Sequence, residues 1–206
     1  LTEQDLANRL GTSRATIRSA LHHLVSEGLV AQVPYTGWMV VSMTARDARE
    51  LVSLRASLES LAAELAATSA NASARARFKA TFDNLVAVAG AKKGAEASEA
   101  DAAFHHAMVE LSGHERLAQH YRLVAQQIRV LIASSNALLS DASALVGQHR
   151  PIHDAIMTGK AEAAVKAVRS HIDEEGRKLV ALLEARERAE AEAPVPQRSK
   201  ARKAAK

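Results

Sequence analysis

The chain has 206 residues, a formal net charge of +4 and no cysteine. The lack of cysteine excludes disulfides, thiolate metal sites and cysteine nucleophiles, and it fits the reducing cytoplasm, where we expect the protein. Aromatic residues make up only 3% of the chain, and no apolar run is long enough to cross a bilayer. The composition therefore predicts a mainly helical protein that has no membrane partner.

The positive net charge is not by itself a nucleic-acid signal, because the C-terminal end supplies it. Residues 198–206 carry five cations and no acid, which leaves a net charge of −1 for the residues before them. This segment also follows two prolines. We therefore predict a disordered basic tail over residues 190–206.

The first forty residues predict two short helices joined by a tight turn. Thr2 is the predicted N-cap of a helix over residues 3–10, Gly11 interrupts it, and Ser13 caps a second helix over residues 14–25. The second helix has an apolar stripe that we expect to be buried, formed by Ile17, Ala20, Leu21 and Leu24.

The opposite face of the second helix has the chemistry of DNA recognition. Arg14, Thr16 and Arg18 lie away from the apolar stripe, near the start of the helix. Arginine can donate two hydrogen bonds to guanine in the major groove. Residues 29–33 and 38–41 then predict two strands around a loop that ends at Gly37. Residues 1–42 are therefore predicted to form a winged helix-turn-helix DNA-binding domain with a small β wing.

From Thr44 onward the periodicity is helical almost throughout. A helix beginning after Thr44 is predicted to bury a stripe formed by Leu51, Leu54, Leu58, Leu61 and Leu65. A loop is expected at residues 90–94, and further helices are expected at about residues 72–89, 97–112, 114–139, 141–157 and 160–189. The prediction for residues 43–189 is an all-α antiparallel bundle of about six helices.

Histidine and aspartate residues in the bundle have a spacing that suggests a metal site. Asp101 and His105 are one helical turn apart, as are His149 and His153, and His171 follows on the last helix. Three imidazoles and one carboxylate converging inside a bundle can bind a divalent metal, with zinc as the first choice and nickel or manganese as alternatives. The spacing alone leaves both His149 and His153 as candidates.

The N-terminal segment resembles the winged helix-turn-helix of the GntR superfamily of bacterial transcriptional regulators. The matching positions are Leu6–Ala7, Ser13–Arg14, Ile17–Arg18, Ala20–Leu21, Glu27–Val30 and Gly37. The resemblance implies a homodimer on a short palindromic operator with GT and AC half-site cores. It implies that Arg14 and Arg18 read bases and that Ser13 and Thr16 hold phosphate or base edges. Gly37 would let the wing approach the minor groove. The family's first helix should precede Leu1, so we expect the domain to be truncated here.

The rest of the chain resembles the FCD ligand-binding domain of the FadR-type branch of this superfamily. The resemblance begins at Leu54-Arg55-x-x-Leu58-Glu59 and is strongest around Asp101-x-x-Phe104-His105, His149-x-x-Ile152 and His171. It implies the metal ligands Asp101, His105, His149 and His171, and so favours His149 over His153.

These observations predict a metal-dependent, ligand-responsive transcriptional repressor with double-stranded DNA and a small organic acid as partners. Arg55 is the candidate for pairing with the anionic effector, and a structural ion pair with Glu59 is the alternative. A metallohydrolase with a fused DNA-binding domain is a second hypothesis, and a non-specific DNA-binding module is a third. Glu110, the acid nearest to the predicted site in sequence, should face away from it, which leaves hydrolysis without a general base. We therefore expect a sensor and not an enzyme.

Overall fold

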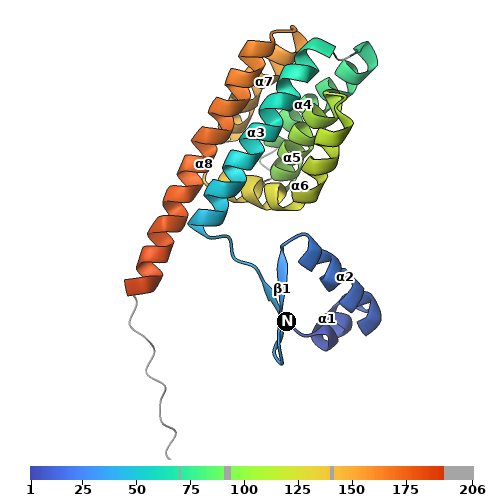
Figure 1. Cartoon of the computed structure of the whole chain (residues 1–206), viewed down its shortest axis with the longest axis vertical. Helices are drawn as coiled ribbons and strands as arrows, with labels where there is room; N and C mark the ends of the chain where they lie inside the picture. Colours follow the sequence, from blue (N-terminus) through green and yellow to red (C-terminus); the bar gives the residue numbers. More distant parts are fainter. Residues whose placement is uncertain (70, 91–93, 140–141, 193–206) are drawn as a thin grey trace, which may run out of the picture.

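The protein consists of a small N-terminal winged module and a larger helical bundle (Figure 1). A computed structural model describes residues 1–69, 71–90, 94–139 and 142–192. The winged module contains α1 (Glu3–Leu10), α2 (Arg14–Ser26), β1 (Val30–Val33) and β2 (Gly37–Val40). The bundle contains α3 (Ala45–Ser69), α4 (Ala72–Gly90), α5 (Gly94–Leu111), α6 (Glu115–Asn136), α7 (Ala142–Met157) and α8 (Ala161–Glu192). The predicted fold class is confirmed.

The winged module is organised by the helix caps that the sequence predicts. The Thr2 hydroxyl accepts a hydrogen bond from the Asp5 amide, and Gly11 ends α1 with φ of 62°. The Ser13 hydroxyl accepts from the Thr16 amide at the start of α2. The two strands pair antiparallel, from Val30 opposite Val40 to Val33 opposite Gly37. A small core joins helices and sheet through Ala7, Ile17, Leu21, Val30 and Trp38. Ala20 is exposed, so that part of the predicted stripe is wrong.

The bundle begins with a capping box. The Thr44 hydroxyl accepts from the Asp47 amide, and the Asp47 carboxylate accepts from the Thr44 amide. The carboxylate of Glu187, on α8, accepts from the Ala45 amide at 2.7 Å. The start of α3 is therefore fixed to α8, which runs beside it in the opposite direction (Figure 1).

The buried face of α3 differs from the predicted leucine stripe. Leu54 and Leu61 are 42% and 41% exposed. Leu51 is buried as predicted, but the other buried apolar positions of α3 are alanines, namely Ala45, Ala48, Ala56, Ala62, Ala63, Ala66 and Ala67. Small side chains allow α3 and α8 to approach closely, and a Cβ at Gly176 of α8 would lie 2.7 Å from the Val52 side chain. Close packing, and not leucine burial, therefore decides which face of α3 points inward.

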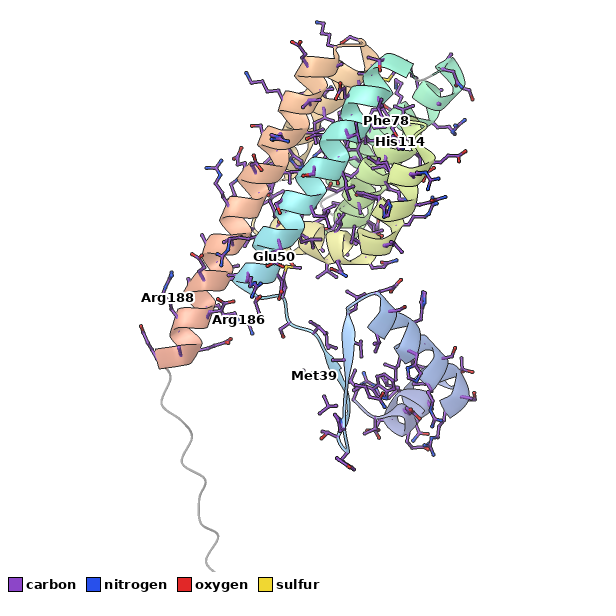
Figure 2. The ribbon with its side chains drawn as sticks, in the orientation of Figure 1. Met39, Glu50, Phe78, His114, Arg186 and Arg188 are labelled. Carbon is purple, nitrogen blue, oxygen red and sulfur yellow. The ribbon has the colours of Figure 1, made fainter. Side chains whose placement is uncertain are left out.

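Helix boundaries mostly agree with the prediction to within a few residues. The largest differences are at α5, which begins at Gly94 and not at 97, at α6, which ends at Asn136 and not at 139, and at α8, which continues to Glu192. Residues 190–192 of the predicted tail are therefore helical, and that part of the prediction is wrong. The last turns of α8 extend beyond the bundle, and Arg186 and Arg188 project from them (Figure 2). The predicted tail, from residue 193 on, and residues 91–93 of the predicted loop lie outside the described residues. Within the described ranges, no helix has the length and apolarity needed to cross a membrane.

Candidate functional site

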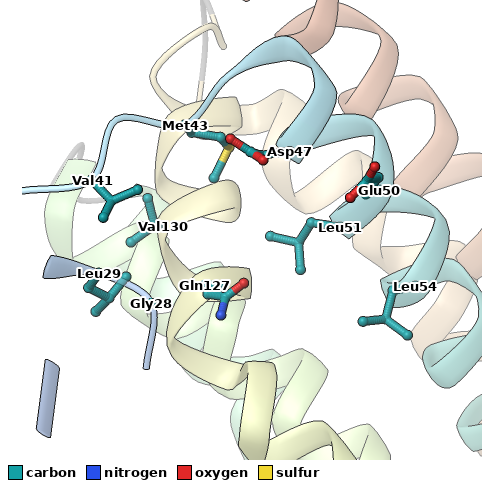
Figure 3. Close-up of a pocket in the computed structure, with 10 residues that line it drawn as sticks. All are labelled: Gly28, Leu29, Val41, Met43, Asp47, Glu50, Leu51, Leu54, Gln127 and Val130. Carbon is teal, nitrogen blue, oxygen red and sulfur yellow. The ribbon is translucent and has the colours of Figure 1, made fainter. Parts of the chain in front are cut away.

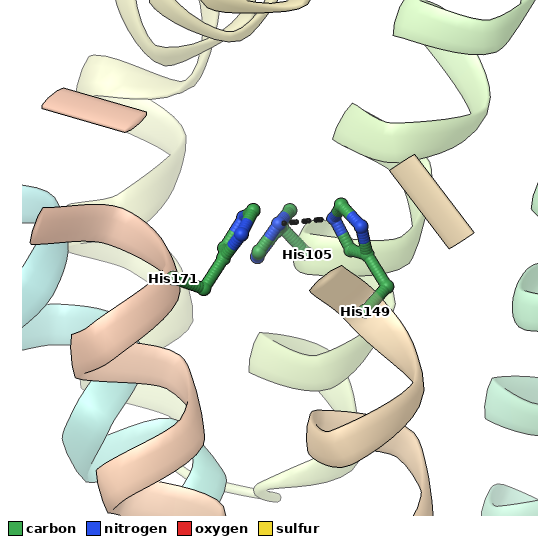
Figure 4. Close-up of side chains that lie close together, drawn as sticks. All are labelled: His105, His149 and His171. Carbon is green, nitrogen blue, oxygen red and sulfur yellow. Dashed lines mark hydrogen bonds between the residues drawn. The ribbon is translucent and has the colours of Figure 1, made fainter. Parts of the chain in front are cut away.

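The structure brings the four predicted metal ligands together at the centre of the bundle. Asp101 and His105 come from α5, His149 from α7 and His171 from α8, and each is at most 8% exposed. One potential ligand atom from each of the three histidines lies within 4.8 Å of those of the other two (Figure 4). The one-turn spacing of Asp101 and His105 places both on the inner face of α5, as predicted.

Three donor atoms converge at the distances expected around one ion. His105 Nε2 lies 3.1 Å from His149 Nε2, and Asp101 Oδ1 lies 3.2 Å and 2.9 Å from these two nitrogens. Two donors that each lie about 2.1 Å from a shared ion are about 3.4 Å apart in tetrahedral geometry and about 3 Å apart in octahedral geometry. His171 stacks on His105 with ring centroids 5.2 Å apart, and its Nδ1 is buried without a hydrogen-bond partner.

The outer contacts of the rings determine which nitrogen is available to a metal. His149 Nδ1 lies 2.7 Å from the Leu145 carbonyl oxygen, and His105 Nδ1 lies 2.7 Å from Glu59 Oε2. The Leu145 oxygen cannot donate a proton, so Nδ1 is the protonated nitrogen of His149 and its Nε2 lone pair is directed inward. His105 Nδ1 and Glu59 Oε2 form an ion-pair contact without hydrogen-bond geometry. The amide of Asn136, on α6, donates to Asp101 Oδ2 at 2.8 Å. Such outer hydrogen bonds orient the ligands in metal sites.

The electrostatics of the cluster keep its carboxylates charged. Burial opposes ionisation of Asp101, but His149 and His105 hold the pKa of its carboxyl well below the usual range. Burial likewise opposes ionisation of Glu59, yet Arg55 and His105 lower its pKa to about 2. Burial and the neighbouring rings of His149 and His105 lower the pKa of His171 well below its usual value. A neutral imidazole and an ionised carboxylate are the forms that bind metal, so His171 and Asp101 fit a divalent ion. Burial opposes protonation of His105, but Glu59 raises its pKa, so an ion at this site would displace a proton from His105.

The other histidines of these helices are occupied elsewhere. His153 packs against the rings of Phe78 and Phe82, with centroids 5.9 Å and 4.3 Å away. The exposed His106 lies 3.9 Å from Glu110 at the surface of α5. The candidate His153 that spacing alone left open is therefore outside the cluster.

Arg55 lies beside the cluster and forms the ion pair that the sequence left as an alternative. It is 3% exposed, and its Nε donates to Glu59 Oε1 at 2.8 Å. Its Nη2 is buried without a hydrogen-bond partner.

Sequence reasoning did not assign the residues that support the cluster. Glu59 accepts from Arg55 and from the Tyr121 hydroxyl, at 3.0 Å, and it also contacts His105. The sequence indicated Glu59 as an ion-pair partner of Arg55, but no local signal points to its contacts with His105 and Tyr121 or to Asn136.

The predicted DNA-reading residues lie on one exposed surface of the winged module. Arg14 and Arg18 have side chains that are 59% and 55% exposed. Glu3 of α1 accepts two hydrogen bonds from Arg18, from Nε at 2.9 Å and from Nη2 at 2.8 Å, and it lies 3.7 Å from Arg14. The hydroxyls of Ser13 and Thr16 are 2.8 Å apart at the start of the same helix. Sequence reasoning did not anticipate the part played by Glu3.

The wing contains two residues with positive φ. Gly37 has φ of 114°, and Tyr35, at the tip of the loop, has φ of 62° with a fully exposed side chain. Positive φ is costly for a tyrosine, so its presence there is a sign of function that the sequence did not reveal.

Replacing Gly37 with alanine is expected to destabilise the winged module by about 1–3 kcal/mol. A Cβ at Gly37 would lie 2.5 Å from the backbone oxygen of Leu1, and the residue would keep an unfavourable φ. The matched control is Gly113→Ala, because that glycine also has positive φ but its Cβ would meet nothing within 4 Å. Thermal unfolding of both variants tests the prediction. Equal losses of stability would show that the contact with Leu1 has no effect.

Two family profiles match the chain. The profile described as the FCD domain matches residues 50–174, and the profile described as bacterial regulatory proteins, gntR family, matches residues 1–40. The first match covers more than half of the chain and includes all four residues of the buried cluster.

Whole-protein comparisons agree with the profiles. The probable D-xylose utilization operon transcriptional repressor of Paenarthrobacter nicotinovorans is 28% identical over 172 residues, which cover 82% of this chain and 74% of that protein. An uncharacterized HTH-type transcriptional regulator in an unstable DNA locus of Streptomyces ambofaciens is 32% identical over 184 residues, which cover 84% of this chain and 72% of that protein.

Solved structures share the fold. E. coli McbR/YncC has a TM-score of 0.72 at 18% identity, covering 91% of this chain and 87% of that one. A GntR family member from Pseudomonas syringae pv. tomato has a TM-score of 0.56 at 20% identity, and the match covers 90% of this chain and 78% of that one. The relatives in these comparisons are regulators of transcription and not enzymes. The chain therefore belongs to the GntR family of bacterial transcriptional regulators, in the branch whose winged helix-turn-helix is followed by an FCD domain.

Proposed function

We propose that this regulator is a metal-dependent repressor whose DNA binding responds to a small organic acid. The observation that carries the proposal is the convergence of His105 Nε2, His149 Nε2 and Asp101 Oδ1 beside the unpartnered Nδ1 of His171. Asp101, His105, His149 and His171 would hold the ion, with zinc as the first choice. A bound divalent ion would supply a Lewis acid that accepts a carboxylate oxygen of the effector.

The charges around the cluster support an anionic effector. Arg55, Glu59 and Asp101 together carry one net negative charge when all three are ionised. A divalent ion would reverse this to one net positive charge, which a single carboxylate would neutralise. The buried Nη2 of Arg55 is a donor without a hydrogen-bond partner, as an anion-binding group would be before its ligand arrives.

Arg55→Lys is expected to keep the fold and to weaken the response to the effector. Lysine preserves the positive charge beside Glu59 but removes the planar donors of the guanidinium. Arg55→Ala is unsuitable, because removing one partner of a buried ion pair costs about 3–5 kcal/mol of stability. Calorimetric titration with a panel of hydroxy acids, sugar acids and dicarboxylates, before and after Arg55→Lys, tests the role. An unchanged affinity for the bound acid would leave Arg55 with a structural role only.

On the DNA side, residues 1–42 are proposed as the reading domain and residues 43–189 as the sensing domain. Arg14 and Arg18 would contact bases, and Ser13 and Thr16 would contact phosphate or base edges. Gly37 would allow the wing to enter the minor groove, beside Tyr35. A homodimer would place two such modules on a palindromic operator. The D-xylose operon repressor among the relatives supports repression as the direction of control.

Selection of genomic DNA fragments by the purified protein, with zinc and with a chelator, tests the proposal. We expect enrichment of a short palindrome, with an occupancy that changes when zinc is removed. Enrichment that is identical in both conditions would reject metal dependence. Sequence-independent binding with a steep dependence on salt would reject operator recognition.

A further inference from the structure

Helix α6 contacts both the buried cluster and the winged module. The Tyr121 hydroxyl donates to Glu59, which contacts His105, and the Asn136 amide donates to Asp101. Between these two residues, Gln127 Nε2 donates to the backbone carbonyl of Glu27 at 3.0 Å. A single helix, α6, therefore joins the supports of the candidate ligands to the end of α2.

The Gln127 contact is placed at the C-terminal end of the proposed recognition helix. Glu27 is the C-cap of α2, where unpaired carbonyls carry partial negative charge and favour a donor. The next residue, Gly28, has φ of 73°, and a Cβ there would lie 2.9 Å from Gln127 Nε2. Glycine suits this positive φ, and a side chain here would displace the amide end of Gln127.

Beside this hydrogen bond, a cavity of about 380 Å³ separates the two modules (Figure 3). Its walls include Leu29 and Val41 from the winged module and Leu51 and Val130 from the bundle. The hydrogen bond of Gln127 is a direct polar contact between the two modules at the edge of this cavity.

We propose that Gln127 is the positioning residue for DNA reading, and that α6 links its position to the state of the buried cluster. About 13 Å of helix separates Gln127 from Asn136, at 1.5 Å per residue. A shift of Asp101 or Glu59 moves the side chains that hold α6 and is passed to α2 through Gln127. The link through α6 to the buried cluster rests on the proposed function, whereas the positioning role of Gln127 does not.

Spin-label distance measurement tests the positioning role directly. The chain has no cysteine, so Thr12→Cys and Ser170→Cys provide two exposed labels, one on each module. Dilution with unlabelled chains keeps the measured distances within one chain. Gln127→Leu removes the donor at nearly constant size, and Gln126→Leu is the matched control because Gln126 faces the groove between α5 and α6.

We expect Gln127→Leu to broaden or shift the distance distribution and Gln126→Leu to leave it unchanged, without added metal. An unchanged distribution in Gln127→Leu would overturn the proposal.

DNA affinity with and without Zn²⁺ tests the link between the buried cluster and α2, with the parent chain as reference. Loss of one hydrogen bond should reduce the zinc-dependent change in affinity by roughly threefold to tenfold. A parent chain that binds zinc without any change in DNA affinity would reject the proposed metal dependence. If Gln127→Leu kept the full zinc-dependent change in DNA affinity, the link through α6 would be rejected, but not the positioning role.

Discussion

Replacing both His149 and His171 with alanine is expected to abolish zinc binding. The double change removes two of the four proposed ligands, one from α7 and one from α8. Loss of even a residue that only hydrogen-bonds to a metal ligand typically lowers metal affinity by 10-fold to 100-fold. Loss of two ligands should therefore lower the affinity for zinc by more than about 100-fold. Metal analysis of the purified protein and titration with zinc measure the effect.

His153→Ala is the matched control for this experiment. His153 lies one turn from His149 on the same helix, but its ring packs against Phe78 and Phe82. Its loss should leave the zinc content unchanged. Equal stoichiometry in the double variant and the parent protein would reject His149 and His171 as ligands.

The double variant and His153→Ala should differ in how much zinc raises their temperature of unfolding. Zinc at 100 times its dissociation constant stabilises a protein that binds it only when folded by about 2.7 kcal/mol, or roughly 5–10 °C for a chain of this size. The parent protein and His153→Ala should show this rise, and the double variant should not. A comparison within each variant, with and without zinc, removes any difference in the stability of the metal-free proteins.

The parts of this protein that the sequence predicted well depend on local chemistry. Thr2, Ser13 and Thr44 cap their helices as expected, because a hydroxyl beside free backbone amides requires no distant partner. The spacing of Asp101 and His105 fixes a shared helix face in the same way. Such features need only a few neighbouring residues to be recognised.

The features that the sequence missed depend on contacts between distant elements. Leu54 and Leu61 repeat with helical periodicity, yet each is more than 40% exposed, because the buried face of α3 consists mainly of alanines. Glu59 is completely buried since Arg55, His105 and Tyr121 stabilise it from three helices. The contact of Gln127 with Glu27 spans a hundred residues. No local pattern in the sequence reports such partners.

Arg18→Ala is expected to abolish specific DNA binding while the helical content is retained. The hydrogen bonds to Glu3 engage Nε and Nη2 of Arg18. Since a guanidinium has five N–H donors, three remain, and the outer pair can reach a guanine edge. Glu3 thus holds the side chain in a fixed direction. A bidentate contact with guanine is worth about 1–3 kcal/mol, and a dimer makes it twice, so specific affinity should fall towards the non-specific level.

The fold should survive because the Arg18 side chain is 55% exposed, and an ion pair at the surface contributes at most about 1 kcal/mol. Arg9→Ala provides the control, since Arg9 is an exposed cation at the end of α1 that is not on the proposed reading helix. Affinities for the selected operator and for a scrambled duplex, measured at two salt concentrations, separate base reading from phosphate attraction. A variant that keeps operator affinity within twofold of the parent would refute the assignment of Arg18. If operator and scrambled DNA lost affinity in equal proportion, Arg18 would be a phosphate contact, and sequence reading would have to come from other side chains of α2 or from the wing.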